Sequence, residues 1–307
     1  MTAVLSTVST LVVCWNNREF LGRCLESVPA GSDLVVVDNA SSDGSADIVA
    51  EQFPTARLIR NATNVGFAAA VNQAAKLATS PYLLLLNPDA EATPRSIERL
   101  ATTLDERVTC GAAAGRLLSM TEEALPDFHA RRLPTLSSVA ADLLLLSRIW
   151  PTNPVTRYAE GLDISVSTTA PVELMAASSL LVRREAFEGV GGLDERFSPA
   201  WFEDVDFCKR LRDRGWDIYF VPGAVFRHIG GVSMRGLGRA RQKRVFYRNL
   251  ERYVRKHHGR AAAAAVKAML VAGMSMRVAG SALQADRDGV HAFAGVLGGT
   301  LSGWRRE

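Results

Sequence analysis

The clearest candidates for acid–base chemistry are three closely spaced acids, Glu203, Asp204 and Asp206, which directly follow two aromatic residues. The pattern of residues 203–213 predicts a helix, and the dipole at the start of a helix stabilises each exposed acid by about 0.3–1 kcal/mol. Adjacent helical residues point about 100° apart, so Glu203 and Asp204 cannot serve one ligand equally well. One carboxylate can therefore act as a general base while a neighbour holds substrate or structure.

Two further sets of polar residues follow apolar runs that predict buried strands. Asp38 follows residues 34–37 and can accept hydrogen bonds from the ribose or the base edge of a nucleoside. Asn87 and Asp89 flank a proline just after residues 82–86, where a carboxylate oxygen suits Mg²⁺ or Mn²⁺ bridging the phosphates of a nucleotide. For each set the alternative is an ordinary turn in which the side chain bonds to nearby backbone.

His228 is a candidate metal ligand, because two glycines follow soon after it and would let a ligand approach the backbone closely. The alternative is a structural histidine that is satisfied within the fold, which is the commoner role of a lone histidine. The glycines at 230–231 and 236–238 follow neither a first strand nor a tight turn into a helix, so they form no dinucleotide-binding fingerprint. A dehydrogenase is therefore disfavoured.

The first ninety residues alternate strand-like apolar runs with helical patterns. Asn16 or Asn17, Ser45 and Thr93 are candidate N-caps of three of the helices. Strands that alternate with helices at this spacing predict a parallel, doubly wound sheet flanked by helices. Ligands of such sheets lie beyond the carboxyl ends of the strands, where Asp38 and Asp89 are expected. The predicted strands are residues 10–15, 34–37, 57–60 and 82–86, and another helix is predicted over 66–78.

The remainder of the chain is less regular. Residues 172–182 and 218–221 predict further strands, and residues 203–213 predict a helix with Gly215 just past its end. The stretch 126–154 contains several prolines and a Leu-rich run, and it is interpreted either as a flexible or lipid-facing excursion or as a buried core helix. A basic and then Ala-rich helical tail follows.

The composition of the 307-residue chain is that of an ordinary globular protein, with 48% hydrophobic and 22% charged residues. Disordered, collagen-like and coiled-coil proteins are thereby excluded. The four cysteines contain no CxxC pair and are predicted to be packing residues in a reducing compartment. The N-terminus lacks a basic segment before its short apolar run, and charges interrupt the long apolar stretches, so we expect a cytoplasmic protein without a membrane span.

The formal net charge of +4 hides an uneven distribution. Residues 227–260 contain eleven basic side chains and one acid, about +10, which leaves about −6 for the rest of the chain. A basic block on an otherwise acidic protein predicts an anionic partner, which can be a nucleic acid, a phospholipid surface or a diphosphate.

The order and combination of these motifs are more specific than any one of them alone. The motifs are residues 36–45, 64–68, 86–89, 191–195 and 202–206, together with His228. With them the sequence resembles the inverting family 2 glycosyltransferases of the GT-A fold over about residues 9–258, and most closely their rhamnosyltransferase-like bacterial members.

The resemblance implies a role for each site residue. Donor binding would fall to Asp38 and Asn39, which contact the nucleoside, and to Asn64, Gly66 and Asn87. The metal, Mg²⁺ or Mn²⁺, would bind Asp89 and His228; Asp204 would be the catalytic base; and the acceptor or supporting residues would be Trp201, Glu203 and Asp206. Asn39 and Asn87 stand where many family members have Asp, which removes negative charge from the nucleoside and metal sites.

The implied reaction is a single displacement with inversion, in which a nucleoside-diphosphate sugar gives its sugar to a hydroxyl of a glycan or polyprenyl-linked saccharide. The expected donor is dTDP-rhamnose and the expected pathway makes cell-envelope polysaccharide. A UDP-sugar donor, such as UDP-GlcNAc or UDP-galactofuranose, remains an alternative. A non-catalytic protein or a nucleic-acid-binding protein is a remote alternative, because it leaves Asp89 and the acids at 203–206 without a role.

The expected domain organisation is a GT-A catalytic domain over residues 1–226, followed by a helical extension over 227–307. The nucleotide-sugar half of the catalytic domain would span about 1–115 and the acceptor half about 116–226. The extension is expected to meet the inner face of the cell membrane peripherally, with packing on the catalytic domain or a homodimer as the alternatives.

Overall fold

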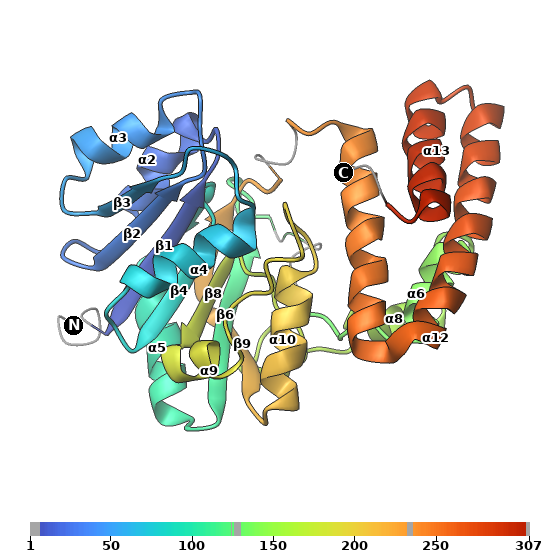
Figure 1. Cartoon of the computed structure of the whole chain (residues 1–307). Coiled ribbons are helices and arrows are strands. Elements are labelled where there is room, and N and C mark those ends of the chain that lie inside the picture. Colours follow the sequence, from blue (N-terminus) through green and yellow to red (C-terminus); the bar gives the residue numbers. More distant parts are fainter. Residues whose placement is uncertain (1–6, 124, 126–129, 232–235, 305–307) are drawn as a thin grey trace. The chain divides into compact units, whose positions relative to one another are not determined.

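The computed structural model describes residues 7–123, 125, 130–231 and 236–304 (Figure 1). The chain forms two compact units. The first, here called the sheet unit, comprises Met1–Arg131, Ile164–Pro199 and Glu203–Ser233, and the second, the helical unit, comprises Arg132–Asp163, Ala200–Phe202 and Met234–Glu307. These borders differ from the expected division at residue 226, because residues 132–163 group with the C-terminal helices.

Four parallel strands form the N-terminal half of the sheet. They are β1 (Val8–Cys14), β2 (Asp33–Asp38), β3 (Arg57–Arg60) and β4 (Tyr82–Leu86), in the order β3-β2-β1-β4. Helices α2 (Arg18–Glu26), α3 (Ser45–Gln52) and α4 (Phe67–Leu77) connect them. Strands β1 and β4 are buried along their whole length, as expected of apolar runs in a sheet that helices cover. The strands and helices predicted for this half are confirmed.

Of the predicted helix caps, Asn17 has the predicted position, whereas Ser45 and Thr93 do not. Ser45 is the first residue of α3, because its amide and hydroxyl both donate to Asp43 Oδ1 (2.9 and 2.6 Å) and Gly44 takes the cap position at φ 83°. Asn17 occupies the cap position of α2 without a side-chain cap hydrogen bond. Helix α5 (Ser96–Glu106) begins three residues after Thr93, whose hydroxyl donates to a backbone carbonyl of a neighbouring strand instead (2.8 Å).

The other half of the sheet is mixed rather than parallel. It contains β5 (Ala90–Ala92), β6 (Cys110–Leu118), β7 (Ala170–Val172), β8 (Ser179–Arg183) and β9 (Asp217–His228), and the full order is β3-β2-β1-β4-β8-β6-β9-β5 with β7 beside β9. Strand β8 is antiparallel to both β4 and β6. Strand β7 pairs antiparallel with β9 rather than with β8.

Two predicted strands have different bounds in the structure. Residues 172–182 were expected to form one strand, but they contribute to β7 and β8 with a non-strand segment between. The strand expected at 218–221 extends to residue 228, so His228 is the last residue of β9. Helix α9 (Arg184–Gly189) follows β8, and α10 (Glu203–Asp213) has the predicted bounds. All four cysteines are buried and free, which confirms their packing role.

The helical unit contains α6 (Leu136–Leu143), α7 (Leu146–Ile149), α8 (Pro154–Ala159), α12 (Arg239–Leu283) and α13 (Arg287–Ser302). Gly259, at φ 85° and ψ 179°, interrupts α12. The Ala-rich part of α12 packs within its own unit: Val266, Leu270 and Met274 are fully buried, and α12 lies along α13. Close approach to α6 needs the glycine at 273, because a Cβ there would lie 2.1 Å from the Leu143 carbonyl oxygen.

The basic block is partly neutralised within the fold. Arg227 pairs with Glu122, Arg239 with Asp286 at 3.3 Å, and Arg255 with Glu251 at 3.4 Å, whereas Arg235 lies outside the described residues. In the part of the chain that the structure describes, α12 is the one helix with the length and composition of a membrane span, a test that core helices of soluble proteins also pass. Part of the Leu-rich stretch forms α6, and residues 126–129 are not described.

Candidate active site

Strand register brings the first set of candidate residues to one edge of the sheet. Strands β2 and β4 pair in parallel with β1 on its two sides, so Asp38 at the end of β2 and Asn87 just after β4 lie at the same edge of the sheet. Strand β5 then pairs antiparallel with β9, with Ala90 opposite His228. This pairing places Asp89 beside a residue that is 139 positions away in the sequence.

Asp89 and His228 form a buried polar pair. Asp89 Oδ1 lies 3.1 Å from His228 Nε2, and the backbone amide of Gly230 donates to Asp89 Oδ2 at 3.1 Å. The side-chain Nδ2 of Asn87 lies 3.3 Å from the same His228 Nε2. Both Asp89 and His228 are buried, so strand pairing and the Gly230 amide fix their orientation.

The donor atoms of this pair fit a divalent cation that is shared with a ligand. In one tautomer Nε2 of His228 donates a proton to Asp89 Oδ1, and in the other its single lone pair accepts from Asn87 Nδ2. A cation between Nε2 and Oδ1 would use that lone pair in place of the Asn87 hydrogen bond. Among the described residues there is no group of three or more His, Cys, Asp or Glu side chains suited to a metal. Diphosphate oxygens and water would therefore complete the coordination shell, as is usual for Mg²⁺.

Asn39 and Asn64 form an amide network in the expected nucleoside site. Asn39 Oδ1 accepts from the Val65 amide at 3.0 Å, and Asn39 Nδ2 donates to Asn64 Oδ1 at 2.9 Å. The Gly66 amide donates to the same Asn64 oxygen at 2.9 Å. Gly66 has φ 88°, and a Cβ there would lie 2.7 Å from Ser198 Oγ, so the position requires glycine. These side chains therefore hold the loop before α4 in place.

Asp38 is buried next to this network. Its Oδ2 accepts from the Ser41 amide at 3.1 Å, and its Oδ1 lies 3.5 Å from Cys14 Sγ. The carboxylate therefore faces the small-residue loop after β2, where the backbone can approach a ligand closely.

We predict that Asn39→Asp destabilises the protein by about 1–3 kcal/mol, because the new carboxylate cannot donate to Asn64 Oδ1 and instead faces an acceptor. Asn64→Asp is the matched control: Asn64 uses Oδ1 to accept both bonds, and a carboxylate keeps both. Thermal or urea unfolding of the ligand-free protein measures the difference. Equal stability losses in the two variants would show that the direction of the Asn39–Asn64 bond is unimportant.

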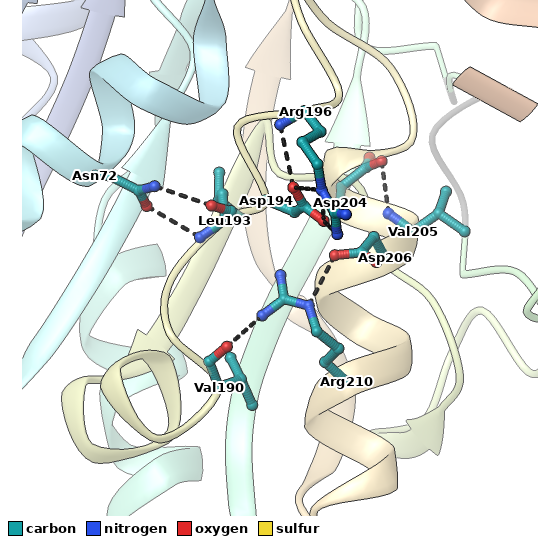
Figure 2. A network of polar contacts seen from close by, with 9 residues as sticks. All are labelled: Asn72, Val190, Leu193, Asp194, Arg196, Asp204, Val205, Asp206 and Arg210. Atoms are coloured by element: carbon teal, nitrogen blue, oxygen red, sulfur yellow. Dashed lines mark hydrogen bonds and ion pairs between the residues drawn. The ribbon is translucent and has the colours of Figure 1, made fainter. Parts of the chain in front are cut away.

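The three acids of α10 have different environments, two of which are drawn in Figure 2. Asp206 is fully buried and accepts from Arg210 Nε at 2.7 Å, while Arg210 Nη1 donates to the Val190 carbonyl at 2.6 Å. Asp206 is thus part of an internal ion pair. Asp204 is only partly buried, and its Oδ1 accepts from the Val205 amide at 2.8 Å.

Glu203 is buried, and its Oε2 has no hydrogen-bond partner within the described part of the chain. Burial and then the nearby charge of Asp204 raise the pKa of Glu203 well above its ordinary value, so its fold favours the protonated form. Burial also raises the pKa of Asp204. A raised pKa makes the Asp204 carboxylate a stronger base, and its partial exposure gives it access that Asp206 lacks.

Asn72, which the sequence analysis did not identify, holds the loop before α10 in place through two hydrogen bonds. Asn72 in α4 donates to the Leu193 carbonyl at 2.9 Å and accepts from the Leu193 amide at 3.0 Å (Figure 2). Asp194 in the same loop pairs with Arg196 at 2.6 Å. The available signal was a pair of polar residues, Asn72 and Gln73, in the middle of an Ala-rich helix, which hydrophobic periodicity does not interpret.

Asn249 is a second residue that was missed, and its contacts lie within the helical unit. Its buried Nδ2 donates to the carbonyls of Ala200 at 2.9 Å and Trp201 at 3.1 Å. Trp201 and Phe202 both have positive φ, 70° and 72°, a strained backbone for bulky residues. The next residue in the chain is Glu203, so Asn249 stabilises the strained segment that leads into the acid cluster.

Comparison with known proteins identifies the family. The sequence model described as Glycosyl transferase family 2 matches residues 9–153. An N-acetylglucosaminyl-diphospho-decaprenol L-rhamnosyltransferase of Mycobacterium tuberculosis is 30% identical over 244 residues, which cover 74% of this chain and 76% of that protein. The chain belongs to glycosyltransferase family 2. The family expected from the sequence motifs is therefore confirmed.

Solved structures confirm the GT-A fold for this family 2 chain. A mannosyltransferase from Pyrobaculum calidifontis, solved with GDP-Man and Mn²⁺, matches with a TM-score of 0.55 at 17% identity and covers 98% of this chain and 88% of that one. GalNAc-T7, solved with UDP, GalNAc and Mn²⁺, matches with a TM-score of 0.54 at 18% identity over 73% of this chain and 44% of that one. At these identities the likeness establishes the fold.

Proposed function

We propose that this family 2 glycosyltransferase moves L-rhamnose from dTDP-rhamnose to a hydroxyl of a polyprenyl-diphosphate-linked saccharide, with inversion, in cell-envelope polysaccharide synthesis at the inner face of the cell membrane. The proposed reaction rests on where three side chains lie in the sheet unit. Asp89 and His228 lie together at the strand ends, and the partly exposed Asp204 lies at the start of α10. The name of the mycobacterial relative supports the choice of sugar and lipid-linked acceptor.

Asp89 and His228 would hold Mg²⁺ or Mn²⁺, which supplies positive charge to the departing diphosphate when it is bound. The Gly230 amide keeps Asp89 Oδ2 in place for this role. Asp38 and the loop held by Asn39 and Asn64 would receive the nucleoside, with Gly66 and Asn87 close to the donor.

Asp204 would take the proton of the acceptor hydroxyl as its oxygen bonds to C1 of the sugar. The bond from C1 to the diphosphate oxygen breaks on the opposite face, so configuration inverts without a covalent intermediate. Asp206 supports this position through its ion pair with Arg210, and burial favours the protonated form of Glu203 beside Asp204. Trp201, whose carbonyl accepts from Asn249, is proposed as an acceptor or supporting residue.

A panel of nucleotide sugars tests the donor. We expect dTDP-rhamnose with Mg²⁺ or Mn²⁺ to raise the unfolding free energy by about 2.7 kcal/mol at 100 times its Kd, and to be hydrolysed slowly without acceptor. UDP-GlcNAc and UDP-galactofuranose are the comparison donors, and a chelator removes the metal contribution. Stabilisation by a UDP-sugar and not by dTDP-rhamnose would replace the proposed donor.

A further inference from the structure

Exposed apolar side chains are concentrated in one segment of the helical unit. Of the fifteen large hydrophobic side chains that are exposed in the described part of the chain, seven lie between residues 136 and 162. Four of these seven occur within seven residues, and we call them the apolar tip: Leu144, Leu146, Ile149 and Trp150. Ile149 is 78% and Trp150 is 55% exposed, which is unusual for such large apolar side chains.

The apolar tip is built into ordered structure. The amide of Trp150 donates to the Leu146 carbonyl at 2.8 Å, and Leu145 has a positive φ of 65° at the start of α7. The buried side chain of Asn153 donates to the Trp150 carbonyl at 2.6 Å and accepts from the Thr156 amide at 2.9 Å. These bonds fix the backbone on both sides of Ile149 and Trp150, so their exposure is set by the fold.

The apolar tip is also anchored to the longest helix of its unit. Arg277 of α12 donates from Nη1 to the Leu143 carbonyl and from Nη2 to the Asp142 carbonyl, both at 2.7 Å. The glycine at 273 lets the two segments approach closely. The backbone that leads into the apolar tip is therefore held against α12 by these two bonds.

The one charged residue within the apolar tip is the exposed Arg148, while the exposed acids Asp142 and Glu160 lie outside the tip on either side. No acid occurs in the sequence between Asp142 and Glu160, and Arg148 and Arg157 are both exposed in this interval. Exposed Trp and Ile side chains with neighbouring Arg residues match the boundary between acyl chains and anionic headgroups. A second copy of the chain fits less well, because a stable protein interface buries about 800 Å² on each partner and a seven-residue tip falls short of that.

We propose that the apolar tip inserts into the surface of an anionic lipid bilayer, with Ile149 and Trp150 among the acyl chains and Arg148 and Arg157 at the headgroups. This inference rests on the proposed lipid-linked acceptor and assigns the membrane contact to α7 and its flanks, not to the basic block of α12. Arg239 and Arg255 of that block already pair with acids of the protein. Docking through the tip would hold the enzyme where its acceptor is embedded.

Vesicle co-sedimentation of the full chain tests the proposal. We expect binding to phosphatidylcholine vesicles that contain phosphatidylglycerol, weaker binding to phosphatidylcholine alone, and a loss of at least about tenfold in affinity for Ile149→Ser combined with Trp150→Ser. Val108→Ser is the matched control, since Val108 is 81% exposed in the sheet unit. Unchanged binding of the double variant, or no binding by the unaltered chain, would overturn the proposal.

Two further results separate this inference from the proposed function. Asp204→Asn should bind vesicles like the unaltered chain, because vesicle binding needs neither donor nor acceptor. The double variant should keep its transfer rate with a short, water-soluble acceptor. Sedimentation velocity without vesicles reports self-association, and a dimer that the double variant abolishes while vesicles remain unbound would assign the apolar tip to a second copy instead.

Discussion

Asp204→Asn is expected to bind the donor almost as tightly as the unaltered enzyme and to lower kcat by about 10²- to 10⁴-fold. The amide keeps the size of the side chain and its bond from the Val205 amide, but it cannot take a proton from the acceptor hydroxyl. Donor binding is measured by calorimetry and transfer by product formation under single-turnover conditions. Substantial transfer by this variant would move the base to a neighbouring acid.

Glu203→Gln is the matched control for Asp204. Because burial raises the pKa of Glu203 and so favours its neutral form, we expect the neutral amide to leave transfer nearly unchanged. The raised pKa means that Glu203 ionises at a cost to the fold, so the unaltered protein loses stability as pH rises through that pKa and the Gln variant does not. For Asp204 the raised pKa predicts that transfer falls as pH drops through a value above the ordinary range of Asp.

Asp89→Ala is expected to remove the metal-dependent part of donor binding, a loss of at least about 100-fold or 2.7 kcal/mol. The substitution removes the carboxylate that faces His228 Nε2 and leaves the histidine as the single remaining ligand of the pair. Donor affinity should be measured with Mn²⁺ and with a chelator, since the proposal concerns the difference between them.

Glu91→Ala controls for the loss of one negative charge near the same strand. Glu91 lies two residues further along in β5 and pairs with Arg23 at 3.4 Å rather than with His228. We expect it to bind donor with the same metal dependence as the unaltered enzyme. If the two variants lost metal dependence equally, or if Asp89→Ala kept it, the assignment of the metal to Asp89 and His228 would be wrong.

The N-terminal half of the fold could be predicted because its information is local. The apolar runs of β1, β2 and β4 are bounded by polar turns, and the helices between them have clear periodicity. The sequence did not predict that β8 lies between β4 and β6 and runs antiparallel to both. Pairing between segments about a hundred residues apart leaves no local pattern in the sequence. The packing of α6 on α12 was missed for the same reason: the glycine at 273, which allows the two helices to approach closely, is more than a hundred residues from α6 in the sequence.

The site was predictable only in part for a related reason. Spacing indicated that Asp38 and Asp89 lie at strand ends, but it did not pair Asp89 with His228; family resemblance did. The clamps made by Asn72 and Asn249 depend on side-chain bonds to distant carbonyls. Single asparagines in helices carry no signal of such partners, so these residues were found only once the structure placed them.

The most direct test of the account is transfer itself, with dTDP-rhamnose as donor and a polyprenyl diphosphate carrying N-acetylglucosamine as acceptor. The account predicts a rhamnosylated lipid product that forms only with Mg²⁺ or Mn²⁺ present, and NMR of its anomeric carbon should show the configuration opposite to that of the donor. Retention of configuration, undiminished transfer in the presence of a chelator, or transfer from a UDP-sugar but not from dTDP-rhamnose would contradict it.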